Sequence, residues 1–264
     1  MSNKVRLLIL LACLCVAPGA AQAGWVAQWV NTAFKQNGDR LDPQSSTMRI
    51  AKGKIKVEQP HAVTLIDYGR GSYTILNPEK QYFWTGTVDQ FIEEMTRERN
   101  VTLKRRMKMK KDPLKSDVSE VDISKLPKIA IEKTAETKTI AGHATTKYVI
   151  RADDEIFQEI WLAPTLNLAR DIDVDKYLEY ERKMSIFMLG KSGKLFNALY
   201  RNDEYRKLLG TGFVLETTTR HIAGGYEQVA TDFKESEIPA GEFEVPESYR
   251  RVRLADVLTQ SQQG

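Results

Sequence analysis

Cysteine and histidine are scarce in this sequence of 264 residues. Both cysteines, Cys13 and Cys15, lie within the first 23 residues. Without those residues the chain has no thiol, which excludes disulfides, zinc–thiolate sites and cysteine nucleophiles. The three histidines, His61, His143 and His221, are far apart and lack the spacing of metal ligands or of a catalytic triad. We therefore expect no cofactor, no metal site and no catalytic residue, and hence a protein that is not an enzyme.

An excess of charge of one sign is also lacking. The formal net charge is +4, and 28% of the residues are charged. A chain of this kind does not have the basic character of a nucleic-acid-binding domain, so we expect no nucleic-acid partner. Hydrophobic residues make up 42% of the sequence, close to the globular average, which excludes disordered and multi-span membrane proteins. The oligomeric state is not determined by these features.

The N-terminus has the features of a secretory signal peptide. Lys4 and Arg6 precede an apolar run over residues 7–17, and Ala21-Gln22-Ala23 follows. The run is shorter than the roughly 20 apolar residues that span a bilayer. We expect export to the periplasm with cleavage after Ala23. The alternative is a lipoprotein box at residues 10–13, in which Cys13 would be acylated and would anchor the chain to a membrane.

We divide the chain into four parts. Residues 1–23 are the signal peptide, and residues 24–47 are expected to be an N-terminal segment and linker, because a short amphipathic start precedes a stretch rich in glycine, aspartate, proline and serine. Residues 48–253 are expected to form a single β-barrel-like domain with helical insertions near 88–111 and 174–210. Residues 254–264 form a C-terminal tail, which includes a short helix near 254–258.

Alternating apolar residues and turn signals predict about nine or ten antiparallel strands. One feature stays open: in the hairpin whose turn is Asp153-Asp154, Tyr148 and Ile150 share a face either with Ile156 and Ile160 or with Phe157 and Trp161. The predicted strands cover residues 48–58 with a break at Gly53, 63–68, 72–76, 81–85, 129–134, 145–151, 156–162, 213–220 and 226–234.

Helical periodicity appears in two places. A capping-box pattern over residues 87–90 begins the first helix, and Val88, Phe91, Ile92 and Met95 form one apolar stripe. The second region runs from Val174 to Gly210 and contains two stripes. Strands and helices do not alternate regularly, so the predicted class is α+β, with a curved antiparallel sheet whose concave face the helices cover.

An acidic run at Asp171-Ile172-Asp173-Val174-Asp175 begins like a calcium-binding loop. Its sixth position is Lys176 instead of glycine and its twelfth is Arg182 instead of glutamate. We therefore interpret the run as the N-terminus of a helix, where acidic residues are favoured.

Six basic residues cluster in eight positions at the end of the first helical region. A solvated helix end explains them, because cations suit the C-terminal end of a helix dipole. The alternative is weak, salt-sensitive contact with an anionic membrane surface. The candidate membrane-surface residues are Lys104, Arg105, Arg106, Lys108, Lys110 and Lys111.

Three ordered motifs resemble an exported bacterial family of unknown function (domain of unknown function 4412). They are residues 65–68 with 73–82, residues 138–148 with 159–163, and residues 243–249, where Ser248 replaces a usual glycine. That family is similar to the periplasmic lipoprotein carriers and the outer-membrane lipoprotein receptors. The resemblance implies a half-open antiparallel β-barrel with helices packed in or over its concave face, around an apolar cavity.

We therefore expect an exported, non-enzymatic binding protein of the cell envelope that holds an acyl chain or other apolar ligand. The alternative is a structural or interaction protein of the envelope with a filled barrel and no ligand. Large apolar and aromatic residues on the predicted strands are the candidates for the cavity lining. The candidate ligand-binding residues are Ile75, Trp84, Tyr148, Ile160, Trp161 and Phe213.

Overall fold

The protein is built on one large sheet of twelve strands. The computed structural model describes residues 21–109, 125–167, 169, 171–185, 191–221 and 224–258. Their order across the sheet is β12-β6-β5-β4-β3-β2-β1-β11-β10-β9-β8-β7. The strands are β1 (Gln22–Lys35), β2 (Gln44–Ala51), β3 (Lys54–Gln59), β4 (Ala62–Asp67), β5 (Ser72–Asn77), β6 (Tyr82–Thr87), β7 (Ile129–Ile140), β8 (His143–Ala152), β9 (Glu155–Ala163), β10 (Phe213–His221), β11 (Gly224–Ile238) and β12 (Arg250–Arg251).

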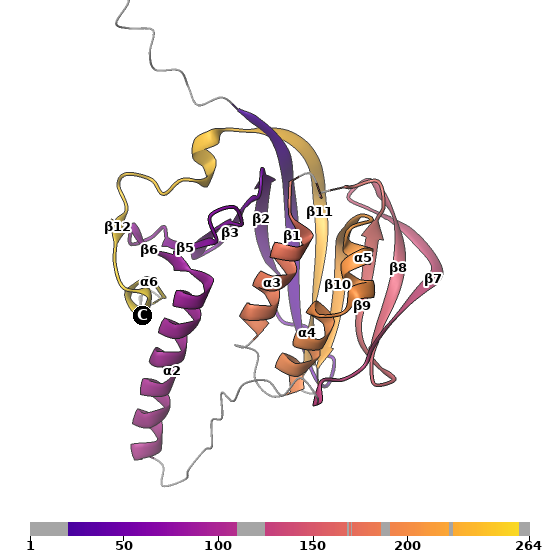
Figure 1. Ribbon diagram of the computed structural model, residues 1–264, viewed down its shortest axis with the longest axis horizontal. Coiled ribbons are helices and arrows are strands. Elements are labelled where there is room, and N and C mark those ends of the chain that lie inside the picture. The colour runs from indigo at the N-terminus through magenta and orange to yellow at the C-terminus, as the bar shows by residue number, and fades with distance from the viewer. Residues whose placement is uncertain are drawn as a thin grey trace, which may run out of the picture.

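The sheet is antiparallel except at one edge, and it does not close into a barrel. β12 pairs with β6 in parallel, and β12 and β7 are the two edges. The long strands β1 and β11 lie side by side in its middle (Figure 1). The expectation of an α+β protein with an open, curved antiparallel sheet is thus confirmed.

Helices cover one face of the sheet. Figure 1 shows α3, α4 and α5 together on that face, while α2 extends beyond the sheet near α6. Among the described residues, no helix has the length and apolar character needed to cross a membrane. The helices are α2 (Val88–Met109), α3 (Val174–Met184), α4 (Lys191–Tyr200), α5 (Asp203–Leu209), α6 (Leu254–Leu258) and the short 3-10 helix η4 (Ala240–Phe243).

Tight turns fix the registers of three hairpins. The two central residues of each turn have positive φ angles, as the two-residue turns that match strand twist require. Lys52 and Gly53 join β2 to β3 with φ angles of 47° and 76°. The Asp153-Asp154 turn predicted from sequence joins β8 to β9 in the same way, with φ angles of 46° and 66°.

α2 begins with the predicted capping box. The Gln90 amide donates to Thr87 Oγ1 at 3.1 Å, and the Thr87 amide donates to Gln90 Oε1 at 2.8 Å. Phe91 is 5% exposed and its ring lies 4.7 Å from that of Tyr73 and 5.8 Å from that of Trp84. The first part of α2 is therefore laid on β5 and β6 with Phe91 facing inward.

The interpretation of residues 24–47 as an N-terminal segment and linker is wrong. β1 occupies the first half of this segment, at the centre of the sheet, and β2 begins at Gln44. Trp25, Ala27 and Trp29 are buried on one face of β1, while Val26 packs on the other face against a small cluster around Phe243. Because both faces of the strand are apolar, the strand does not show a simple alternation.

The open question of the β8–β9 register is resolved. Tyr148 lies opposite Ile160, and Ile150 lies opposite Gln158. A bulge follows Ile150, so that Phe157 is the additional residue on β9 and joins the same core as Ile150 and Ile160.

Two hydrophobic cores lie on the helix-covered face. The first core contains residues of α2, α6 and strands β1–β6, among them Trp29, Ile55 and Phe91, and it extends to β7 and β9–β11 through residues such as Ile140 and Phe233. The second core contains residues of β7–β9 and of α3, α4 and α5, among them Phe196 and Leu199. Tyr177 of α3 packs against both. α3 therefore marks the line where the two cores meet.

Candidate functional site

A cavity of about 270 Å³ lies between the sheet and helices α3 and α5. Its sheet side is formed by residues of β1–β4, β10 and β11, and its helix side by residues of α3, α5 and the segment before α3. Apolar side chains dominate the lining. The lining residues are Trp29, Ser46, Met48, Ile50, Ile55, Val57, Ile66, Tyr68, Ala169, Ile172, Val174, Tyr177, Glu181, Tyr205, Leu209, Gly212, Phe213, Val214, Thr217 and Gln228.

Glu181 brings a carboxyl group to this apolar cavity. It follows Tyr177 by one turn of α3, so the two side chains lie on the same helix face. Among the described residues, none makes an ion pair or a hydrogen bond with the side-chain carboxyl of Glu181. Burial raises the pKa of the Glu181 carboxyl to about 7. The carboxyl therefore changes its charge close to neutral pH.

The charge of this carboxyl group acts on seven tyrosines, two of them on α3 itself and five on other elements. Burial raises the pKa of each tyrosine hydroxyl, and the Glu181 charge raises it further, so that the hydroxyls stay neutral at physiological pH. The tyrosines are Tyr68 after β4, Tyr73 on β5, Tyr177 and Tyr180 on α3, Tyr200 on α4, Tyr205 on α5 and Tyr226 on β11.

The acidic run before α3 holds this helix in place, as its interpretation as a helix N-terminus predicts. The Asp173 carboxylate accepts from the backbone amides of Asp175 and Lys176 and caps the helix. Asp171 is buried, and its Oδ2 accepts a 2.9 Å hydrogen bond from Trp25 Nε1. The run is therefore tied to β1 on one side and begins α3 on the other, which positions Glu181.

The structure separates the six candidate ligand-binding residues. Phe213 lines the cavity, and Ile75 lines a second cavity beside α6. Trp84 packs under α2 and its Nε1 donates to Glu94 Oε1 at 3.1 Å. Tyr148 and Ile160 belong to the second core. Trp161 lies on the opposite face from its neighbour Ile160, with Lys138 Nζ 4.1 Å from its ring centroid.

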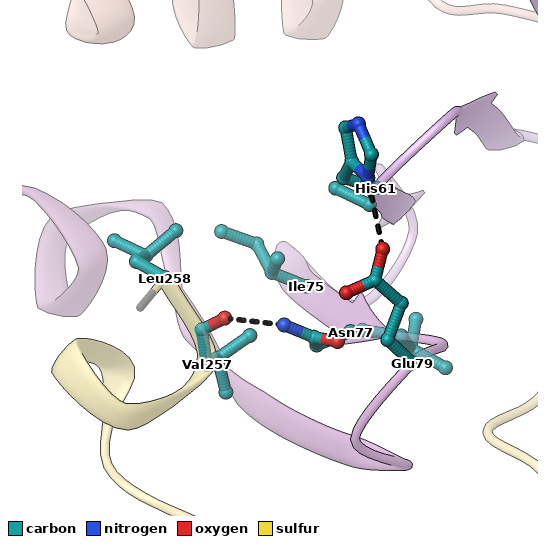
Figure 2. Close-up of a pocket in the computed structure, with 8 residues that line it drawn as sticks. His61, Ile75, Asn77, Glu79, Val257 and Leu258 are labelled. Atoms are coloured by element: carbon teal, nitrogen blue, oxygen red, sulfur yellow. Dashed lines mark hydrogen bonds and ion pairs between the residues drawn. The ribbon is translucent and has the colours of Figure 1, made fainter. Parts of the chain in front are cut away.

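The second cavity, of about 280 Å³, lies between β5 and α6 (Figure 2). His61 Nδ1 lies 2.9 Å from Glu79 Oε1, and Asn77 Nδ2 donates to the Val257 carbonyl at 3.1 Å. Leu258 at its rim is 42% exposed. The hydrogen bond from Asn77 attaches α6 to the sheet. We take the cavity beside Glu181 as the candidate site, because it lies where the two cores meet and holds a carboxyl group that has no partner among the described residues.

Sequence reasoning missed Glu181, although a signal was present. Val174, Tyr177, Leu178 and Met184 form the apolar stripe of α3, and position 181 falls on that stripe. A carboxylate at a position that the helical period places inside is unusual. This carboxylate within an apolar stripe was the signal that could have identified the site.

The candidate membrane-surface residues are not tested. Lys110 and Lys111 lie outside the described residues, and the side chains of 104–108 lie outside them as well. Membrane contact by this basic run stays a prediction. Within the described ranges, no group of three or more histidine, cysteine, aspartate or glutamate residues is placed to hold a metal ion.

No family model matches the chain, and no curated protein matches it. The resemblance to the exported family of unknown function is therefore not supported by a family model. The chain shares 11% identity with PNGF-II at a TM-score of 0.38, where 88% of this chain aligns with 31% of that one. It thus spans about a third of the length of PNGF-II.

Two further structures are also similar. The Pseudomonas aeruginosa MucA/MucB complex gives a TM-score of 0.36 at 11% identity, over 89% of this chain and 59% of the other. A putative outer membrane lipoprotein-sorting protein domain from Vibrio parahaemolyticus gives 0.29 at 10% identity, over 84% and 89%. At TM-scores below 0.5, none of these similarities carries an argument about this chain.

Proposed function

We propose that this protein is an exported, non-enzymatic binding protein that holds an apolar ligand, such as an acyl chain, in the cavity between the sheet and α3. The observation that carries the proposal is the composition of the cavity lining. Met48, Ile55, Val57 and Ile66 form one wall, and few polar groups interrupt it. Ligand sites in proteins share this combination of an apolar concave lining and a small number of placed polar groups.

Export and a lipoprotein-carrier-like fold belong to the same proposal. The leader with its Ala21-Gln22-Ala23 site supports export. The open antiparallel sheet with helices over its concave face supports the half-barrel architecture implied by the three sequence motifs. In such an architecture a ligand is shielded from water by helices on one side and by strands on the other.

A second candidate function is a structural or interaction protein with a filled half-barrel. The observation that favours it is the dense packing of the second core, where Phe196, Leu199, Ile150 and Ile160 are fully buried under α4 and α5. The helices occupy this half of the concave face. Under this alternative, the cavity is a packing gap between the two cores and takes no ligand.

A cavity-filling variant distinguishes the two candidates. Val57 lines the cavity, and Val57→Phe should fill part of it at a cost of about 1–3 kcal/mol in the free energy of unfolding. Thr47 lies between the lining residues Ser46 and Met48 on β2, so Thr47→Phe places the same ring on the opposite face and serves as the control.

Binding of 1-octanol to the folded variants, measured by isothermal titration calorimetry, gives the readout. We expect the wild type and Thr47→Phe to bind the alcohol and Val57→Phe to lose most of that binding. Native mass spectrometry of gently extracted protein should show an apolar adduct that Val57→Phe lacks. A wild type that neither binds octanol nor carries an adduct would favour the filled half-barrel.

A further inference from the structure

We propose that the cavity selects ligands with a cationic head group, an ammonium carried on a short apolar chain, and that Glu181 is the counter-ion of that group. This inference rests on the proposed function, because it names the class of ligand for the same cavity.

The charge of Glu181 is not matched by the protein around it. None of the described residues that line the cavity is lysine, arginine or histidine. Of the basic residues on α3, Lys183 is paired elsewhere, because its Nζ lies 2.8 Å from Asp89 Oδ2 on α2. Buried charges in proteins are normally paired, since an isolated one is costly. A ligand cation would supply the pairing that the chain itself does not.

Tyrosines line the cavity together with Glu181, and they favour a cation as well. Their hydroxyls remain neutral, so they do not compete for the role of counter-ion. The faces of aromatic rings carry negative electrostatic potential and attract ammonium groups, most strongly where water is excluded. Those bordering the cavity itself come from the end of β4, from α3 and from α5, and are Tyr68, Tyr177 and Tyr205.

The same arrangement disfavours an anionic head group. A fatty-acid carboxylate placed here would meet the Glu181 charge without a basic residue in the lining to offset it. Like charges in a low-dielectric site repel strongly. The cavity should therefore rank three ligands of equal chain length as ammonium first, alcohol second and carboxylate last.

The volume of the cavity limits the length of the alkyl chain that a ligand can have. A cavity of about 270 Å³ equals the share of roughly nine water molecules in the liquid, at about 30 Å³ each. Octylammonium has about nine non-hydrogen atoms and is charged at neutral pH, since alkylamines resemble lysine in pKa. Octylammonium, 1-octanol and octanoate are therefore matched probes for the wild-type protein.

Isothermal titration calorimetry at pH 7.5 should show octylammonium binding at least about tenfold tighter than 1-octanol, with octanoate weakest. Glu181→Gln should reduce the octylammonium affinity to that of 1-octanol and leave the alcohol affinity unchanged or higher. Glu179→Gln is the matched control, because Glu179 lies on the same helix with its side chain 58% exposed. Circular dichroism checks that each variant is folded.

The pH dependence adds an independent readout. Octylammonium should bind more tightly at pH 8 than at pH 6, because Glu181 must be ionised to pair with it, while 1-octanol should not gain affinity over that range. Binding of octylammonium near pH 6.5 should release protons, measured by calorimetry in two buffers of different ionisation enthalpy. Glu181→Gln should abolish that release.

The outcomes separate this inference from the proposed function. If 1-octanol binds as tightly as octylammonium, or Glu181→Gln changes nothing, the ligand class is wrong and the cavity remains an apolar site. If octanoate binds best, the inference is likewise overturned. If none of the three probes binds the folded wild type, the proposed function fails together with it.

Discussion

Trp25 and Asp171 are joined by a buried hydrogen bond of 2.9 Å from the indole Nε1 to the carboxylate Oδ2. Trp25 lies on β1 in the middle of the sheet, and Asp171 lies just before α3. The Gly53 amide donates to the Asp171 carbonyl at 2.6 Å, so the same residue also contacts the β2–β3 turn. Asp171 therefore fixes the start of α3 relative to three strands.

Loss of the Asp171 carboxylate should destabilise the protein. Asp171→Ala leaves the buried Trp25 N–H without its acceptor, which costs about 1–3 kcal/mol in the free energy of unfolding. Asp175→Ala, two residues beyond the cap of the same helix, is the control, because its side chain is 75% exposed. Urea titration measures both. Equal stability of the two variants would show that the buried hydrogen bond contributes nothing.

Phe91 should be a principal anchor of α2. Because it is buried between Tyr73 and Trp84, Phe91→Ala should cost about 3–5 kcal/mol. Glu93→Ala removes an exposed side chain from the same helix and should change the free energy of unfolding by less than about 0.5 kcal/mol. A loss within about 0.5 kcal/mol for Phe91→Ala in urea titration would mean that α2 does not depend on this contact.

Glu181 should make the stability of the free protein fall with rising pH. Burial raises its pKa from 4.5 to about 7, so between these values the unfolded chain has already lost the proton that the folded chain keeps. The free energy of unfolding therefore decreases through this window, by at most about 3 kcal/mol, and stays low above pH 7.

Glu181→Gln tests this linkage. The variant should match the wild type near pH 4, where the carboxyl is protonated in both states, and should exceed it at pH 8. Urea titrations at the two pH values give the difference, and Glu179→Gln controls for a surface carboxylate. If the free energies of unfolding of the wild type and Glu181→Gln differ by the same amount at both pH values, the pKa of Glu181 is not raised in the folded protein.

Cleavage after Ala23 should leave a chain that starts at Gly24. β1 would then keep its pairing from Gly24 opposite Ser236 to Lys35 opposite Gly224, so the centre of the sheet survives processing. N-terminal sequencing of the exported protein checks the cleavage position. Recovery of a chain that begins with an acylated Cys13 would instead identify a membrane-anchored lipoprotein.

The hairpins were predictable because their signals are local. Turn residues such as Asp153-Asp154 and the capping box of α2 act over a few positions, and the structure places both as expected. β1 was not predictable in this way. β1 has apolar side chains on both faces, with Val26 on one and Trp25, Ala27 and Trp29 on the other. These side chains are buried by partners that lie far away in the sequence, on β2 near residue 50 and on β11 near residue 230.

The candidate site was less accessible to sequence reasoning than the fold. The residues around Glu181 are dispersed from Tyr68 to Tyr226, and they meet only because the sheet curves and α3 lies across it. Aromatic residues on strands were a reasonable criterion for a lining, and it identified Phe213. This criterion does not distinguish the two faces of β9, so the predicted lining wrongly included Trp161, which lies on the face opposite to Ile160.

The pairing of β1 with β11 has a consequence for the timing of folding. Gln22 lies opposite Ile238 and Lys35 opposite Gly224, so the centre of the sheet joins the two ends of the described chain. Contacts between such distant segments form slowly, because a long loop must close first. Local hairpins such as β2–β3 can form early, but the sheet is incomplete until β11 has been synthesised. For an exported chain, the centre of the sheet would then form only after almost the whole polypeptide has crossed the membrane.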